Sequence, residues 1–143
     1  MRRYRRETLV PLTLLAAASG ARSTAGIAAL RPKSVAPLLE AGEFVYDKVP
    51  SARNRIDRRP LLGRMAAGAV VGAVVAGRTG ANRGEAAIIG SLVALASAYA
   101  TFGLRRALSR RLPAITAAFV EDAIVMGVVA TGAAMLRRNT RAY

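Results

Sequence analysis

The sequence predicts an all-α, multi-pass membrane protein with about five spans, and two observations carry that prediction. Hydrophobic residues make up 53% of the 143 residues although 21% are charged, so the two classes must be segregated along the chain. The apolar residues do form long runs, and most Lys and Arg residues lie between those runs. Each run approaches the roughly 20 residues that cross the hydrocarbon core of a bilayer. The chain length is that of one domain, so we expect a single integral membrane domain over residues 1–143.

The predicted spans follow the apolar runs in order and cover residues 8–30, 34–50, 61–77, 86–103 and 113–136. The first span follows a basic cluster at the N-terminus and contains Arg22. Its early part, Leu9–Ala21, also fits a secretory signal, which combines a basic region, a short apolar region and small residues. The continuation from Ser23 to Leu30 favours a retained helix, and cleavage of the segment stays open as an alternative.

The second predicted span is short and acidic. Glu40, Glu43 and Asp47 are spaced i, i+3 and i+7, which places them on one helical face. A segment of this length spans the bilayer, re-enters it or lies at the interface. The basic residues favour a span, because clusters of four Lys or Arg then alternate with smaller clusters along the chain. The positive-inside rule predicts a cytoplasmic N-terminus and a C-terminus on the outer side.

The third and fourth predicted spans carry small residues at helical spacing. Gly68 and Gly72 form a GxxxG pattern, and Gly90, Ala94 and Ala98 follow one another at intervals of four. Small residues at this spacing allow helix backbones to approach closely. We expect them to pack helices within one chain rather than to form a dimer, and a homo-oligomer or a membrane partner stays open as an alternative.

The fifth predicted span contains Glu121 and Asp122 in a stretch that is otherwise uncharged. Its Leu, Ile, Val and Phe residues favour insertion by about 2.4–4.8 kcal/mol, whereas two central acids oppose it by about 5–7 kcal/mol. The span therefore needs neighbouring helices, water or protonation. We predict one intramembrane polar cluster, in which basic residues of other spans lie near the acids. Its members are Arg22, Glu40, Glu43, Asp47, Lys48, Glu121 and Asp122.

The composition narrows the functional classes. Because the chain has no Cys and no His, it lacks the ligands of His/Cys zinc sites and the usual histidine base, and we expect no metal and no cofactor. No nucleophile motif accompanies the paired acids, so we do not expect an enzyme. A net charge of +14 would suggest nucleic acid binding in a soluble protein. Here the arginines lie in short clusters at segment ends, so the expected partner is the lipid bilayer and not nucleic acid.

Two functional hypotheses follow from the predicted cluster. In the first, the protein is a small transporter or channel whose carboxylates carry protons or cations, because intramembrane acids usually mark ion pathways or relays. In the second, it is a structural or assembly protein whose acids are held by Arg22, Lys48 or a basic residue of a partner subunit. A third interpretation places the acids at the interface or in a shallow water-filled depression.

One stretch carries a family resemblance. The residues Glu43-Phe-Val-Tyr-Asp47-Lys48-Val-Pro50, followed by Asp57 and a Gly-rich span, resemble a bacterial family of small multi-pass membrane proteins, domain of unknown function 4126. The segments Gly20-Ala-Arg22-Ser23, Arg105-Arg106 and Glu121-Asp122-Ala123 are similar as well. The resemblance implies an integral protein of the bacterial cytoplasmic (inner) membrane, and it implies no established activity, substrate or cofactor. The short second span, made more acidic by Glu40, departs from the family pattern.

Overall fold

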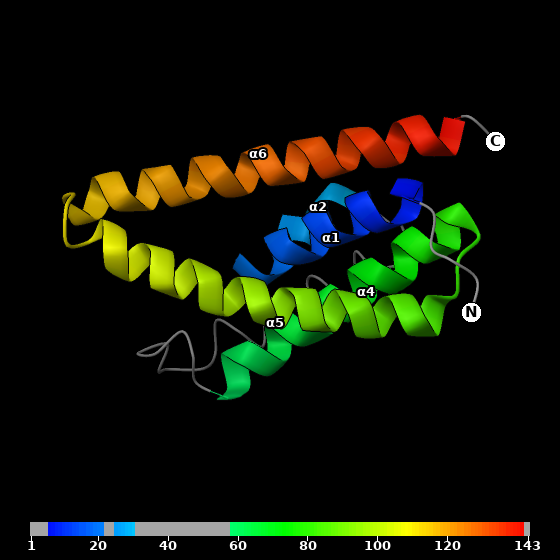
Figure 1. The fold of residues 1–143 in the computed structure, drawn as a ribbon, viewed down its shortest axis with the longest axis horizontal. Helices are drawn as coiled ribbons and strands as arrows, with labels where there is room; N and C mark the ends of the chain where they lie inside the picture. The colour runs from blue at the N-terminus through cyan, green and yellow to red at the C-terminus, as the bar shows by residue number, and fades with distance from the viewer. Residues whose placement is uncertain (1–5, 22–24, 31–57, 142–143) are drawn as a thin grey trace.

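The computed structural model describes residues 6–21, 25–30 and 58–141, and these residues are almost entirely helical (Figure 1). The helices are α1 (Arg6–Ala21), α2 (Ala25–Leu30), α4 (Arg58–Thr79), α5 (Arg83–Leu108) and α6 (Ala114–Arg141). The described ranges contain no β-strand, so the all-α prediction is confirmed for this part of the chain. By length and composition, three helices can cross a membrane, over Pro60–Thr79, Arg83–Leu108 and Phe119–Thr140.

A tight turn joins α4 to α5. Gly80 adopts a φ of 69°, the left-handed conformation that ends many helices and that glycine adopts without a steric penalty. Asn82 then caps α5, because its side-chain oxygen accepts hydrogen bonds from the N–H groups of Gly84 and Glu85 at 2.9 and 3.2 Å. The charge of Glu85 in the first turn is favourable for the helix dipole. These residues define where one apolar helix stops and the next begins.

α4 and α5 pack against each other through small residues. A Cβ on Gly68 would collide with the carbonyl oxygen of Gly90, and one on Gly72 would collide with the backbone of Ala86. A Cβ on Gly90 would in turn meet the Gly68 carbonyl. The three glycines that the sequence singles out therefore lie where the backbones of two helices of one chain touch, which is how such residues promote close helix packing.

α1 occupies the centre of the bundle. More than half of its residues are buried, and it contacts α2, α4, α5 and α6. In Figure 1, α5 and α6 diverge from the turn that joins them, and α1 and α2 fill the space between α6 and the α4–α5 pair. Leu12 and Leu15 of α1 belong to the same core cluster as Val71 and Val75 of α4, and all four side chains are fully buried. The longer helices thus surround α1.

The long helices give the bundle two ends. α4 and α6 both run from the end with the α5–α6 turn, here called the Arg105 end, to the end with the α4–α5 turn, here called the Asn139 end. α1 begins at the Asn139 end, because Asn139 Nδ2 donates a 2.6 Å hydrogen bond to the Glu7 carbonyl oxygen. It finishes toward the Arg105 end, where Arg64 Nη1 donates to the Gly20 carbonyl oxygen at 3.0 Å.

α2 lies back against α1. A Cβ on Gly26 would collide with Ser19 Oγ and with the carbonyl oxygen of Leu15. Arg78 Nη2, near the C-terminal end of α4, donates a 2.7 Å hydrogen bond to the Leu30 carbonyl oxygen at the end of α2. α2 therefore returns toward the end from which α1 starts, and the two helices form a re-entrant hairpin.

This hairpin changes two predictions of topology. The prediction of one spanning helix over residues 8–30 is wrong, because the segment forms two antiparallel helices of 16 and 6 residues, both shorter than a membrane span of about 20 residues. α1 begins and α6 finishes at the same end of the bundle, whereas five crossings place the two termini on opposite sides. The predicted spans 61–77, 86–103 and 113–136 fall within α4, α5 and α6, except for Pro113. The predicted span 34–50 lies outside the described residues.

Candidate functional site

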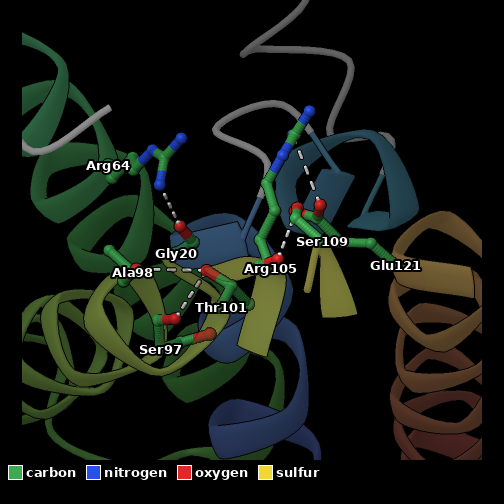
Figure 2. Close-up of polar contacts among 8 residues, drawn as sticks. All are labelled: Gly20, Arg64, Ser97, Ala98, Thr101, Arg105, Ser109 and Glu121. Atoms are coloured by element: carbon green, nitrogen blue, oxygen red, sulfur yellow. Dashed lines mark hydrogen bonds and ion pairs between the residues drawn. The ribbon is translucent and has the colours of Figure 1, made fainter. Parts of the chain in front are cut away.

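Buried polar groups gather at the Arg105 end of the bundle (Figure 2). The buried charged side chains of the described residues are Arg64 in α4 and Glu121 in α6, which are 7% and 5% exposed. Both helices are long and apolar enough to cross a membrane. Ionisable side chains within such helices are costly, and they usually face a protein interior or a water-filled cavity where they serve a function. We therefore take the surroundings of these two residues as the candidate site.

Arg64 holds the C-terminal end of α1. The Gly20 carbonyl that it contacts lies in the last turn of α1, where no helical N–H group is available, and the guanidinium meets the negative end of the helix dipole. Ser97 Oγ of α5 donates a 2.7 Å hydrogen bond to the Ala17 carbonyl oxygen one turn earlier. A Cβ on Gly20 would collide with the backbone of Ala94. Both α4 and α5 thus fix the end of α1.

Arg105 and Glu121 form an ion pair between α5 and α6 (Figure 2). Arg105 Nη1 lies 3.4 Å from Glu121 Oε2, which is longer than the roughly 2.7–2.9 Å of strong charge-assisted hydrogen bonds. The Glu121 side chain is 6% exposed and the Arg105 side chain is 40% exposed. The pair therefore connects a buried carboxylate to the surface. Arg105 also lies in the last turn of α5, where a positive charge is favoured.

Hydroxyl groups continue the polar face of α5 from Arg105 toward α1. Ser97, Thr101 and Arg105 are four residues apart and share one helical face. Thr101 Oγ1 donates to the carbonyl oxygens of Ser97 and Ala98 at 2.9 and 3.1 Å. Its hydrogen is thus committed to its own helix, while its oxygen retains the capacity to accept. Oxygen acceptors therefore line this face from Arg105 to the contact with α1.

The chemistry at this end is that of carboxylate, guanidinium and hydroxyl groups. A single buried carboxylate with hydroxyl oxygens on the neighbouring helix suits a proton or a monovalent cation, whereas Ca²⁺ takes six to eight oxygen ligands. Within residues 6–21, 25–30 and 58–141, no group of three or more His, Cys, Asp or Glu side chains is placed to hold a metal ion.

The acidic pair lies in the N-terminal part of α6. The helix covers Ala114–Arg141, so Glu121 is about 10 Å along it from Ala114 at a rise of 1.5 Å per residue. The predicted span 113–136 places Glu121 at a similar distance from its start. Asp122 is next to it and partly buried.

The rest of the predicted polar cluster lies outside the described residues, namely Arg22, Glu40, Glu43, Asp47 and Lys48. Their convergence on the acidic pair stays a prediction. Sequence reasoning missed two residues of the site. Arg64 had a signal, because it is the one charged residue of the run 61–77. Arg105 had only the family resemblance as a signal, because an arginine that follows an apolar run normally lies at the membrane interface.

Comparisons with known proteins do not extend this site. No family model matches the chain, and no curated protein and no solved structure matches it. The resemblance to domain of unknown function 4126 stays a prediction. We therefore infer the function from the chemistry of the residues at the Arg105 end.

Proposed function

We propose that the protein is a small integral membrane transporter or channel for protons or monovalent cations, in which Glu121 takes the ion. Three helices of sufficient length and apolar character support a location in the membrane. The observation that carries the function is the ion pair at the Arg105 end, where a carboxylate that is 6% exposed contacts an arginine that is 40% exposed. Carboxylates within membranes usually belong to ion pathways or proton relays.

Arg105 acts in this proposal as an internal counter-ion that an incoming ion replaces. The 3.4 Å contact with Glu121 is loose, and the long arginine side chain reaches the interface by snorkelling. A proton or a monovalent cation then neutralises Glu121, which avoids the large cost of an unpaired buried charge. When the ion leaves, Arg105 returns. The site alternates between two neutral states. In one the Glu121 carboxylate is paired with Arg105, and in the other a proton or a monovalent cation neutralises it.

The re-entrant hairpin supports the same proposal. A helix that ends inside a membrane bundle is tolerated where protein surrounds it or where it lines a water-filled cavity, and many transporters bind ions beside interrupted helices. α1 ends against the hydroxyl face of α5, through the bond from Ser97 to Ala17. We expect the ion path to follow this face past the end of α1, while Arg64 keeps that end in place.

Flux measurements in proteoliposomes test the proposal. A pH-sensitive dye reports proton entry, and imposed Na⁺ and K⁺ gradients report cation movement. Glu121→Gln removes the charge and keeps the size of the side chain, so we expect flux to fall to background. The matched control is Glu85→Gln, because Glu85 is an exposed acid in the first turn of α5, at the Asn139 end, and this variant should keep wild-type flux. Equal flux from wild type and Glu121→Gln, or no wild-type flux with any of these ions, contradicts the proposal.

A structural or assembly role is the second candidate, and the contacts of the buried charges favour it. Arg64 joins α4 to α1, and Glu121 joins α6 to α5, so each buried charge ties two helices together. Under this role the wild type carries no flux, and Glu121→Gln lowers the unfolding temperature in detergent or releases a membrane protein that co-purifies with the wild type. The same variant thus separates the two functions.

A further inference from the structure

A hollow at the Asn139 end lies between the first turns of α1 and the last turns of α6. Its volume is about 310 Å³, and it is open to the surface. The residues that define its chemistry are Arg6, Glu7, Val10, Met135, Arg138 and Asn139. It is remote from the candidate ion site, because the Arg105–Glu121 pair belongs to the opposite end of the bundle (Figure 1).

The hollow has a basic rim and an apolar wall. Arg6 and Arg138 are exposed on the rim, and within the described residues neither takes part in an ion pair. Val10 and Met135 form the wall and are 40% and 38% exposed. The hydrogen bond from Asn139 to the Glu7 carbonyl oxygen connects the two helices beside the hollow. Two guanidinium groups beside an exposed apolar surface match an amphipathic ligand with a negatively charged headgroup.

The position along α6 identifies the membrane level of the hollow. Met135 lies at the C-terminal edge of the apolar run of α6, which ends at Leu136, and Arg138 lies just beyond that edge. In a bilayer that edge meets the headgroup region, where arginines near helix ends extend toward the phosphates. The rim is therefore at the height of lipid phosphates, and the wall is at the height of the first methylene groups.

We propose that this hollow binds the headgroup of an anionic phospholipid with a single phosphate. The two arginines contact the phosphate, for which the planar guanidinium group is well suited. The hollow has a volume of about 310 Å³ and is open to the surface, so a phosphoglycerol head can enter it from outside, and the acyl chains lie along Val10 and Met135. The Glu7 carboxylate accepts a hydrogen bond from a headgroup hydroxyl and disfavours a second phosphate.

Native mass spectrometry of the purified protein in neutral detergent tests this site. Phosphatidylglycerol is titrated into the micelles, with phosphatidylcholine and inorganic phosphate as separate arms. We expect one tightly bound phosphatidylglycerol per chain, no comparable binding of phosphatidylcholine and no displacement by phosphate. The double variant Arg6→Gln/Arg138→Gln should bind about thirtyfold more weakly, which corresponds to about 2 kcal/mol for two arginines near an anionic lipid.

Two further variants make the result specific. Arg110→Gln/Arg111→Gln removes the same charge from exposed residues at the Arg105 end and should bind phosphatidylglycerol like the wild type. Met135→Trp fills the hollow without a change of charge and should lose the bound lipid, with helicity by circular dichroism as the check on folding. Equal weakening by both double variants, undiminished binding by Met135→Trp, or displacement by inorganic phosphate overturns the proposal.

The lipid site rests on the membrane location within the proposed function and not on ion transport. Glu121→Gln should therefore keep the bound phosphatidylglycerol even where it abolishes flux. Conversely, if neither the wild type nor any variant binds phosphatidylglycerol, the lipid site is wrong, but the result of the flux experiment is unchanged. Each proposal can therefore be contradicted without the other.

Discussion

Pro11 removes one backbone donor from the interior of α1. In a regular α-helix the N–H group of residue 11 bonds the carbonyl oxygen of Glu7, and proline has no N–H group to donate. Asn139 Nδ2 from α6 donates to that same carbonyl oxygen at 2.6 Å. A neighbouring helix thus replaces the missing bond, as a proline-containing membrane helix requires.

A double-mutant cycle of Pro11→Ala and Asn139→Ala measures this replacement. Asn139→Ala alone should lower the free energy of unfolding by about 0.6 kcal/mol, a typical value for a side-chain hydrogen bond between membrane helices. In the Pro11→Ala background the loss should nearly vanish, because the introduced alanine supplies an N–H group to the Glu7 carbonyl. The cycle cancels the packing change that Pro11→Ala itself introduces.

Reversible unfolding in mixed micelles gives the four free energies of this cycle. Thr140→Ala is a suitable control, because the Thr140 hydroxyl donates to carbonyl oxygens of its own helix, those of Leu136 and Arg137. Its effect should be the same in both backgrounds. Strictly additive effects of Pro11→Ala and Asn139→Ala contradict the proposed replacement.

At the same scale, the sequence indicates one of the two buried charges of the described residues, Glu121, but not the partner of either. Glu121 stands out because it lies in an apolar run, and its burial agrees with that expectation. Its contact with Arg105, 16 positions earlier, depends on the turn between α5 and α6. Arg64 meets Gly20 across 44 positions, which depends on the hairpin of α1 and α2. Partners that are set by tertiary packing leave no local pattern.

At the scale of helices, length and hydropathy identify α4, α5 and α6 but place their ends too early. α5 continues beyond the predicted end at residue 103 to Leu108, and α6 continues beyond residue 136 to Arg141. The additional residues are mostly arginines and polar residues that are compatible with a helix and suit the headgroup region of a membrane. The α1–α2 hairpin was not predictable in this way, because small residues such as Ser19 and Gly26 suit both a straight helix and a close reversal.

The contact between α4 and α5 predicts opposite effects for one substitution at two glycines. Gly72→Ala should lower the free energy of unfolding by about 1–3 kcal/mol, because its Cβ collides with the Ala86 backbone and forces the helices apart. Gly103→Ala meets nothing within 4 Å, and it should raise stability by about 0.5–1 kcal/mol, because alanine loses less backbone entropy in a helix.

Unfolding of both variants in the same mixed micelles provides the comparison. The two sites lie on helices of similar character and receive the same methyl group, so a difference in sign isolates the effect of the contact. If Gly72→Ala is as stable as Gly103→Ala, direct contact of the α4 and α5 backbones is wrong.

At the scale of the whole molecule, the polar and apolar surfaces fit a bilayer. Large apolar side chains on the outer faces of α5 and α6 are exposed, and those of Ile115 and Phe119 are 73% and 72% exposed. α1, in contrast, is mostly buried by the longer helices. An apolar surface of this kind needs a cover, and lipid around the long helices supplies it. In the proposed membrane location, lipid would therefore contact α4, α5 and α6 and not the re-entrant hairpin.

This arrangement predicts the side of the membrane on which each part of the chain lies. The chain has no cysteine, so single-cysteine variants can be labelled with a membrane-impermeant maleimide in sealed and in opened vesicles. Glu7→Cys, Arg83→Cys and Thr140→Cys should react from one side, because α1 begins, α4 turns into α5 and α6 finishes at the Asn139 end. Arg110→Cys, in the turn between α5 and α6, should react from the other side.

The re-entrant hairpin predicts this pattern because an even number of crossings returns the chain to the side on which it starts. If the first segment instead spans the membrane, it makes five crossings together with the predicted span 34–50 and the three long helices. Glu7→Cys and Thr140→Cys then react from opposite sides. Labelling of those two positions from opposite sides therefore contradicts the hairpin.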